Sequence, residues 1–281
     1  MNTTENTLRL PSLDQLVREI GDVGRLLAEM KTSEGHAGNI SVCLTGTMDP
    51  QLLFPESRPY EAPGTFPELA GKYFLVTGSG CRLRDISRQP TANLALLKLG
   101  PDGCSGELFM HPDRHFDRLT SEFNSHLRLH QREFQQPSVS FNAVVHAQPV
   151  YLTYLTHIEH YQDRQRLSDA VLRWQPELIV VFPIGFGFVP FRVPNSNDLM
   201  EATRDLGSSY PLIVWAKHGV VAISHESVSG ALDLIEYVET GAHYEYLNLL
   251  NHEAGDGLMQ SEIQAIRRHF DLPGQVHEPG S

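Results

Sequence analysis

The sequence has few cysteines, no long apolar run and a deficit of basic residues. Its three cysteines, an odd number without CxxC spacing, argue against a disulfide framework and against a thiolate zinc site. No run of about eighteen apolar residues occurs and no basic start precedes an apolar stretch, so neither membrane insertion nor export is expected. With 34 acidic and 22 basic residues the net charge is −12, which disfavours nucleic acid and anionic membranes as partners. A reducing cytoplasm is the expected location.

The composition is that of an ordinary globular chain. Of the 281 residues, 41% are hydrophobic and 20% are charged, which is typical of folded proteins. No repeat, low-complexity tract or linker divides the chain, so we expect one domain over 1–281, with a core at about 15–250 and a flexible tail from Gly255. Fourteen histidines are more than packing alone requires.

The spacing of apolar residues predicts helices and strands in mixed order. Apolar residues three and four apart predict helices, and short β-branched runs between turn residues predict interior strands. The predicted helices are Leu13–Lys31, Phe123–Phe134, Val150–Ile158, Asp163–Trp174 and Ser227–Leu250. The predicted strands are Asn39–Leu44, Tyr73–Val76, Asn93–Leu99, Glu107–Met110, Phe141–His146, Leu178–Phe182, Leu212–Trp215 and Val220–Ile223, with a loop at 50–71. This order predicts a layered α/β or α+β fold.

Polar side chains at the ends of these elements could meet at one metal ion. His146 and Gln148 lie two residues apart at the exit of a strand and therefore point to the same side. His218 closes another strand, where Gly219 lets the backbone turn, and Glu122 opens a helix whose positive end favours a carboxylate. Two imidazoles, an amide and a carboxylate suit a divalent ion with open coordination positions. Taken singly, each histidine is more often a hydrogen-bonded residue at a strand end, and Glu122 is as readily a helix-start residue.

Small and hydroxyl-bearing turns offer an anion site. Gly38-Asn39, Thr77–Gly80 and Thr120-Ser121 stand at the ends of predicted strands and at a helix start, where backbone N–H groups can approach a phosphate. None has Walker or dinucleotide spacing, so nucleotide binding is poorly supported, and each glycine turn alone is usually only a turn.

Other chemistries have weaker signals. No GxSxG elbow is present, and Cys43 and Cys81 are interpreted as structural. His126 and His130, four residues apart on a predicted helix, could bind a metal but lack the glutamate of an HExxH motif. We interpret them as a partly solvated helix face.

Together, four stretches resemble the class II aldolase/adducin family. They are Gly38–Ser41, Phe74–Gly80, Thr120–Glu122 followed by Val144–Pro149, and Lys217–Val221. The resemblance covers about residues 15–250 and extends to motif order and length. The segment Pro176–Pro183 and the insertion at 50–71 favour the rhamnulose-phosphate branch of the family over the shorter fuculose-phosphate branch.

The resemblance implies a fold, an activity and a set of roles. The implied fold is one three-layer αβα domain around a largely antiparallel sheet, assembled as a ring-shaped homotetramer with active sites near subunit interfaces. The implied activity is a zinc-dependent lyase that cleaves a ketose 1-phosphate into dihydroxyacetone phosphate and an aldehyde. The implied roles are metal ligands at His146 and His218, a base at Glu122 and a second acid near the pocket at Glu177. The phosphate cradle would comprise Asn39, Ser79, Gly80, Thr120 and Ser121.

The chain departs from the family pattern at two positions. The family's His-x-His reads His146-Ala147-Gln148 here. An amide oxygen is a weaker zinc ligand than an imidazole nitrogen, so zinc affinity should fall and the preferred metal should shift from zinc toward a harder divalent ion. His36 stands where relatives carry a smaller polar residue, which could alter the phosphate pocket. Two alternatives therefore remain open: a non-catalytic binding or assembly module, and a related sugar-phosphate lyase or epimerase.

Overall fold

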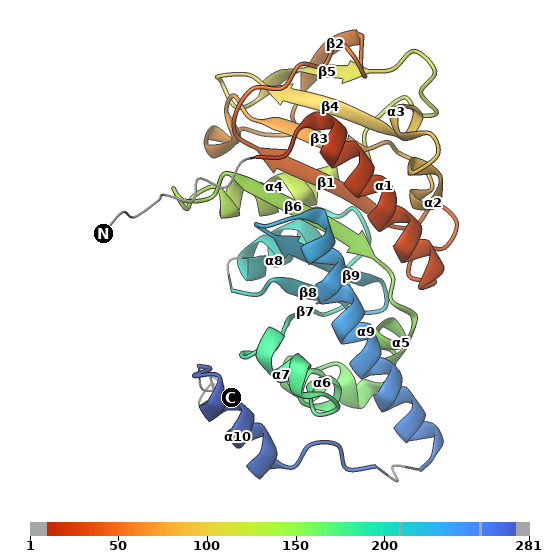
Figure 1. The fold of residues 1–281 in the computed structure, drawn as a ribbon, viewed down its shortest axis with the longest axis vertical. Coiled ribbons are helices and arrows are strands. Elements are labelled where there is room, and N and C mark those ends of the chain that lie inside the picture. The colour runs from red at the N-terminus through yellow and green to blue at the C-terminus, as the bar shows by residue number, and fades with distance from the viewer. Residues whose placement is uncertain (1–9, 208, 253–254, 274–281) are drawn as a thin grey trace.

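A single sheet runs through the computed structural model, which describes residues 10–207, 209–252 and 255–273 (Figure 1). In the described residues nine strands pair in the order β2-β5-β4-β3-β1-β6-β9-β8-β7, all antiparallel except the parallel pair β7–β8. In chain order the strands are β1 Asn39–Leu44, β2 Glu56–Glu61, β3 Tyr73–Thr77, β4 Leu94–Leu99, β5 Ser105–Met110, β6 Phe141–Ala147, β7 Gly187–Val189, β8 Leu212–Trp215 and β9 Gly219–Ser224. The expected largely antiparallel sheet is confirmed.

Helices cover both faces of this sheet. The long helices α1 and α9 lie on one face, and α4 and α8 lie on the other (Figure 1). The helices are α1 Leu13–Glu29, α2 Leu83–Ile86, α3 Pro90–Asn93, α4 Phe123–Glu133, α5 Val150–Leu155, α6 Arg164–Leu172, α7 Pro176–Val181, α8 Asn197–Gly207, α9 Val228–Leu250 and α10 Gln260–His269. The αβα layering is therefore confirmed. Within the described residues no helix is long and apolar enough to cross a bilayer.

Strand alternation sorts apolar and polar side chains between the two faces. In β1, Ile40 and Val42 join the core beneath α1 and α9, and Val145 of β6 does the same. The intervening positions of both strands point to the face covered by α4 and α8 because successive side chains alternate. Those positions include Ser41 and His146, both buried. The polar residues of the central strands thus gather under α4.

One apolar run was assigned to the wrong kind of element. The sequence predicted a strand at Leu178–Phe182, whereas the structure has α7 at Pro176–Val181. Pro176 lies in the first helical turn, where a missing N–H breaks no helical hydrogen bond. A short apolar run carries no periodicity that separates a buried strand from a buried helix, so this prediction was wrong.

The excursion at 50–71 and the C-terminal region also differ from the predictions. The predicted loop contains β2, an exposed edge strand that pairs with β5, and its residues lack the apolar alternation of a half-buried strand. The tail expected from Gly255 includes α10, whose Arg267 donates from Nη2 to the Pro183 carbonyl at 2.8 Å. Residues 274–281 lie outside the described residues.

His126 and His130 of α4 are fully buried, so the prediction of a partly solvated helix face was wrong. Ser41 Oγ lies 2.7 Å from Nδ1 of His126 and 2.7 Å from Nε2 of His130. Burial lowers the pKa of His130 to about 3. Burial, with His130 and His146 nearby, lowers the pKa of His126 well below its ordinary value. Both imidazoles are neutral in the folded protein because a charge there would be desolvated.

We expect these two histidines to make the fold acid-sensitive. Below about pH 6.5 the unfolded chain protonates both rings, whereas the folded chain keeps His130 neutral down to about pH 3 and His126 neutral well below its ordinary pKa, so stability is lost as the pH falls. Protonation of His130 in the unfolded chain should lower the free energy of unfolding by about 1 kcal/mol between pH 7 and pH 5.5, and His126 acts in the same direction. His130→Gln should reduce that pH-dependent difference by about 1 kcal/mol, measured by urea denaturation at both pH values. An unchanged difference in this variant would show that His130 titrates in the folded state.

Candidate metal and active site

A cavity of about 190 Å³ opens beside the ends of β3 and β6 and the starts of β1 and β9. It is lined by most of the polar residues that the sequence singled out, from segments far apart in the chain. The lining residues include Asn39, Ser79, Gly80, Thr120, Ser121, Glu122, His146, Gln148 and His218. A larger hollow of about 500 Å³ between α4 and α8 is lined by other residues, and in the described part of the chain Glu122, His146 and His218 form the only group of three histidine or acidic residues close enough to share one ion. The cavity is therefore the candidate site.

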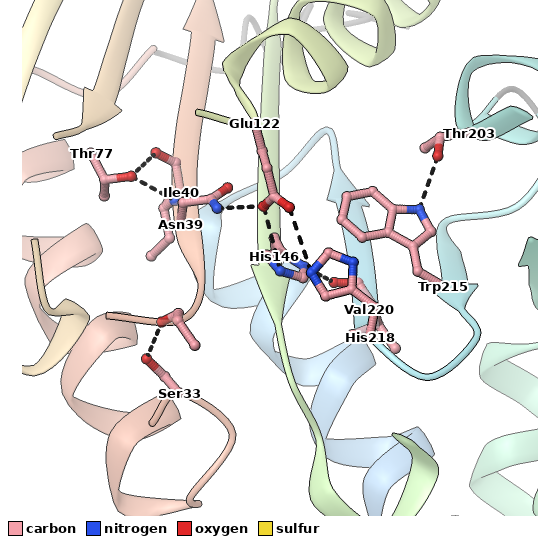
Figure 2. A network of polar contacts seen from close by, with 11 residues as sticks. Ser33, Asn39, Ile40, Thr77, Glu122, His146, Thr203, Trp215, His218 and Val220 are labelled. Atoms are coloured by element: carbon pink, nitrogen blue, oxygen red, sulfur yellow. Dashed lines mark hydrogen bonds and ion pairs between the residues drawn. The ribbon is translucent and has the colours of Figure 1, made fainter. Parts of the chain in front are cut away.

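Glu122, His146 and His218 point toward one another inside it (Figure 2). Glu122 Oε2 lies 3.5 Å from Nε2 of His146, and Glu122 Oε1 lies 3.6 Å from Nε2 of His218. Glu122 occupies the N-cap position of α4, but its side chain makes no capping hydrogen bond. It accepts instead from Nδ2 of Asn39 at 2.7 Å. The reading of Glu122 as a simple helix-start residue does not describe this geometry.

The tautomer of His146 follows from its hydrogen bond. Its Nδ1 lies 2.8 Å from the carbonyl oxygen of Val220 in the neighbouring strand β9. A carbonyl oxygen only accepts, so Nδ1 carries the proton and donates it. In the neutral ring Nε2 is then left with a free lone pair, and this is the atom that faces Glu122. Such backbone-oriented imidazoles are the usual form of a metal-binding histidine.

His218 is held in a tight turn and against an indole. The turn between β8 and β9 places Lys217 in the left-handed region at φ 62°, and the ring of Trp215 stacks at 5.2 Å on that of His218. The indole Nε1 of Trp215 donates to Thr203 Oγ1 at 2.9 Å, which fixes the indole (Figure 2). Burial and the nearby His146 lower the pKa of His218 to about 4 against the opposing effect of Glu122. The ring is therefore neutral at neutral pH and available as a ligand.

These residues fit a divalent metal ion. The three candidate ligand atoms lie within 4.8 Å of one another. A tetrahedral zinc ion with bonds of about 2.1 Å separates its ligand atoms by about 3.4 Å, close to the 3.5 Å between Glu122 Oε2 and Nε2 of His146. Nδ1 of His218 and Oδ1 of Asn39 are buried without a hydrogen-bond partner in the described residues. Both atoms are therefore free to bind a ligand in the site. Gln148 lines the same cavity, and its backbone N–H donates to the Thr32 carbonyl at 2.7 Å.

The predicted phosphate turns are joined to one another by backbone hydrogen bonds. The N–H of Ser79 donates to the Arg118 carbonyl at 2.8 Å, and that of Thr120 donates to the Thr77 carbonyl at 3.0 Å. Thr77 Oγ1 also accepts from the N–H of Ile40 at 3.1 Å, which links both turns to β1. None of the residues that line the cavity is a lysine or arginine. An anion here would meet hydroxyls, amides and backbone N–H groups.

Some lining residues were not predicted, and one predicted residue lies elsewhere. Pro194 and Asn195 line the cavity from the loop before α8, with Asn195 at φ 62°; their sequence signals only a turn. His36, noted as a departure, also lines the cavity. Glu177 is exposed on the first turn of α7 and does not line the cavity.

With this geometry in place, comparison with known proteins identifies the family. A profile of the Class II Aldolase and Adducin N-terminal domain matches residues 18–246. The chain belongs to the class II aldolase and adducin family. The matched residues lie close to the extent of about 15–250 that the resemblance had indicated.

Individual relatives of this class II aldolase support the same family membership. The chain is 29% identical over 266 residues to a rhamnulose-1-phosphate aldolase of Bacteroides thetaiotaomicron, covering 94% of this chain and 97% of that protein. A sugar-phosphate aldolase from Thermotoga maritima has a similar structure, with a TM-score of 0.72 and 29% identity, covering 85% of this chain and 96% of that one. An L-fuculose 1-phosphate aldolase at 17% identity and a TM-score of 0.58, covering 94% of this chain and 99% of that one, shares the fold. The chain is thus a lyase of the class II aldolase type with a site suited to a divalent metal.

Gly219 gives a direct test of the site's packing. It opens β9 without a left-handed φ, so it does not make the sharp turn that the sequence suggested. A Cβ at this position would overlap the carbonyl oxygen of Ala147 and lie 3.2 Å from Cε1 of His146. We expect Gly219→Ala to destabilise the fold by about 1–3 kcal/mol and to weaken metal binding, measured by thermal unfolding and by metal content after dialysis. Gly64→Ala, where a Cβ would meet only the flexible end of Arg128 and part of Phe66, is the control; equal losses in both variants would contradict the packing argument.

Proposed function

We propose that this chain is a metal-dependent aldolase that cleaves a ketose 1-phosphate, of the rhamnulose 1-phosphate kind, into dihydroxyacetone phosphate and an aldehyde. The observation that carries the proposal is the convergence of Glu122, His146 and His218 in one cavity with the phosphate turns. The relatives named above as rhamnulose-1-phosphate and sugar-phosphate aldolases support the substrate class.

The phosphate end of the substrate would be bound by neutral donors. Ser79, Thr120 and Ser121 offer hydroxyls, Asn39 offers an amide, and Gly80 lets the backbone approach closely at φ 76°. His36, on the turn before Gly38, is an additional donor at the same wall of the cavity. Binding energy at the phosphate holds the reacting carbons in place, away from the site of bond cleavage.

Glu122 would move the proton. Asn39 Nδ2 fixes Oε2 of Glu122 by its 2.7 Å hydrogen bond, so the carboxylate has one orientation toward the cavity. In the synthetic direction Glu122 removes a proton from the carbon beside the substrate carbonyl, and in cleavage it returns one there. His146, His218 and Gln148 would hold the divalent metal, for which we propose zinc or a harder divalent ion. When bound, that ion supplies a Lewis acid for the negative charge that develops on the carbonyl oxygen.

We further propose a cytoplasmic homotetramer. The three cysteines are free, as expected in a reducing compartment. The surface formed by α5 and the C-terminal half of α9 exposes apolar side chains that a neighbouring subunit would cover. They are Val150, Tyr154, Tyr244, Leu247 and Leu250. Because Glu177 does not line the cavity of its own chain, we propose that it acts in the site of a neighbouring subunit.

Mixing two variants tests both acidic roles. Glu122→Gln and Glu177→Gln should each lower kcat for ketose 1-phosphate cleavage by about 10²–10⁴-fold. Mixed tetramers made by co-expression of the two variants should recover about a quarter of the wild-type rate. A site is intact only when its own subunit supplies Glu122 and the neighbouring subunit supplies Glu177, and each condition is met in about half of the sites. The exposed Glu226→Gln is the control. Full activity of Glu177→Gln alone, or no recovery on mixing, would contradict the role across the interface.

The position of Gln148 separates this proposal from a non-catalytic module. Gln148→His restores a third imidazole beside His146, so zinc affinity and turnover should both rise, zinc affinity by about tenfold or more. Isothermal titration with zinc and the cleavage rate measure the two effects. A wild-type protein that retains no divalent ion after supplementation, together with a variant that gains neither property, would favour a binding or assembly module.

A further inference from the structure

A second row of polar side chains lies directly behind the residues of the cavity. Ser41 follows Asn39 by two residues on β1, and Asn142 precedes His146 by four on β6, so each pair shares a sheet face. His126 follows Glu122 by one turn at the start of α4, and the backbone N–H of His126 donates to the backbone carbonyl of Glu122 at 3.2 Å. Each of these three elements therefore brings one residue to the cavity and one to the row behind it.

The row is a continuous hydrogen-bonded chain, completed by His130 of α4. From one end, Nδ1 of His126 lies 2.7 Å from Ser41 Oγ, which lies 2.7 Å from Nε2 of His130. Nδ1 of His130 then lies 2.9 Å from Nδ2 of Asn142. All four side chains are 0% exposed. This row of hydrogen bonds therefore connects α4, β1 and β6 in the buried interior.

Proton counting shows that this chain has a defined arrangement. The Asn142 amide nitrogen only donates, so Nδ1 of neutral His130 accepts and its Nε2 carries the proton and donates to Ser41 Oγ. The single Ser41 hydroxyl proton is then donated to Nδ1 of His126. Apolar side chains of similar size would fill the same space at lower desolvation cost but would give α4 no directed contact to β1 and β6, whose backbone ladder already sets their mutual register. A fully buried hydrogen-bonded chain holds one geometry instead.

We propose that Ser41, His126, His130 and Asn142 are positioning residues that fix Asn39, Glu122 and His146 at the spacing a metal ion requires. The inference rests on the proposed function, because it assigns the row to the service of a metal in the cavity. None of the four residues lines the cavity or touches the ion or the substrate. Their effect is transmitted through β1, β6 and the first turn of α4.

Cobalt binding tests this role without an activity assay. Co²⁺ replaces zinc in N and O sites, and its visible absorption depends on the ligand geometry. Ser41→Ala should weaken Co²⁺ affinity by about tenfold or more and change the visible spectrum, as loss of outer partners does in metal sites. Ser125→Ala makes the same chemical change at another buried position of α4 and should leave both unchanged. Wild-type affinity and spectrum in Ser41→Ala, whatever its thermal stability, would overturn the proposal.

Two substitutions of His126 separate positioning from simple packing. Only Nδ1 of His126 contacts Ser41, and an asparagine amide occupies nearly the place of Nδ1, whereas a glutamine amide reaches the place of Nε2. His126→Asn should therefore retain Co²⁺ affinity within about threefold, while His126→Gln should lose about tenfold or more. Equal Co²⁺ affinity in both variants overturns the proposal. If Ser41→Ala fails to fold, the comparison of His126→Asn with His126→Gln tests the positioning role by itself. A wild-type chain that binds no Co²⁺ removes the proposed function itself, whereas altered variants are judged only against a wild type that binds.

Discussion

The antiparallel pairing of β6 with β1 on one side and β9 on the other is the constraint on which the site depends. It sets Asn39 opposite His146 and Val221 opposite the same residue. The Val220 carbonyl is thereby placed to accept the Nδ1 proton of His146, which leaves Nε2 free for a metal. A shift of one residue in this register would turn His146 to the apolar face beneath α1 and α9.

Close backbone approach at this pairing explains the glycine that follows His218. The strand β9 begins where β6 ends, and a side chain at Gly219 would overlap the Ala147 carbonyl. Lys217 adopts the left-handed conformation of the turn. Gly219 instead allows the close approach of the β9 backbone to the Ala147 carbonyl. His218 lies between them and is directed toward Glu122.

The electrostatics of the site follow the acidity of the chain. A protein of net charge −12 binds a phosphate ester poorly through its overall field. The cavity contains no lysine or arginine among its lining residues. The proposed phosphate contacts are therefore neutral donors, and the proposed metal supplies the positive charge. Neutral buried imidazoles at His126 and His130 are consistent with this arrangement, since a cation beneath the site would repel the metal.

The sequence by itself determined the order of most elements, the sheet-end positions of His146 and His218 and the turns around Gly80 and Thr120, because these depend on local spacing and residue type. It could not assign Leu178–Phe182, which is helical, because a short apolar run has no diagnostic period. Only the tertiary structure decided that His126 and His130 are buried. It also placed Glu122 against both imidazoles while Glu177 stays outside the cavity. The physical reason is that burial and convergence depend on which distant strands pair, and local sequence does not encode that pairing.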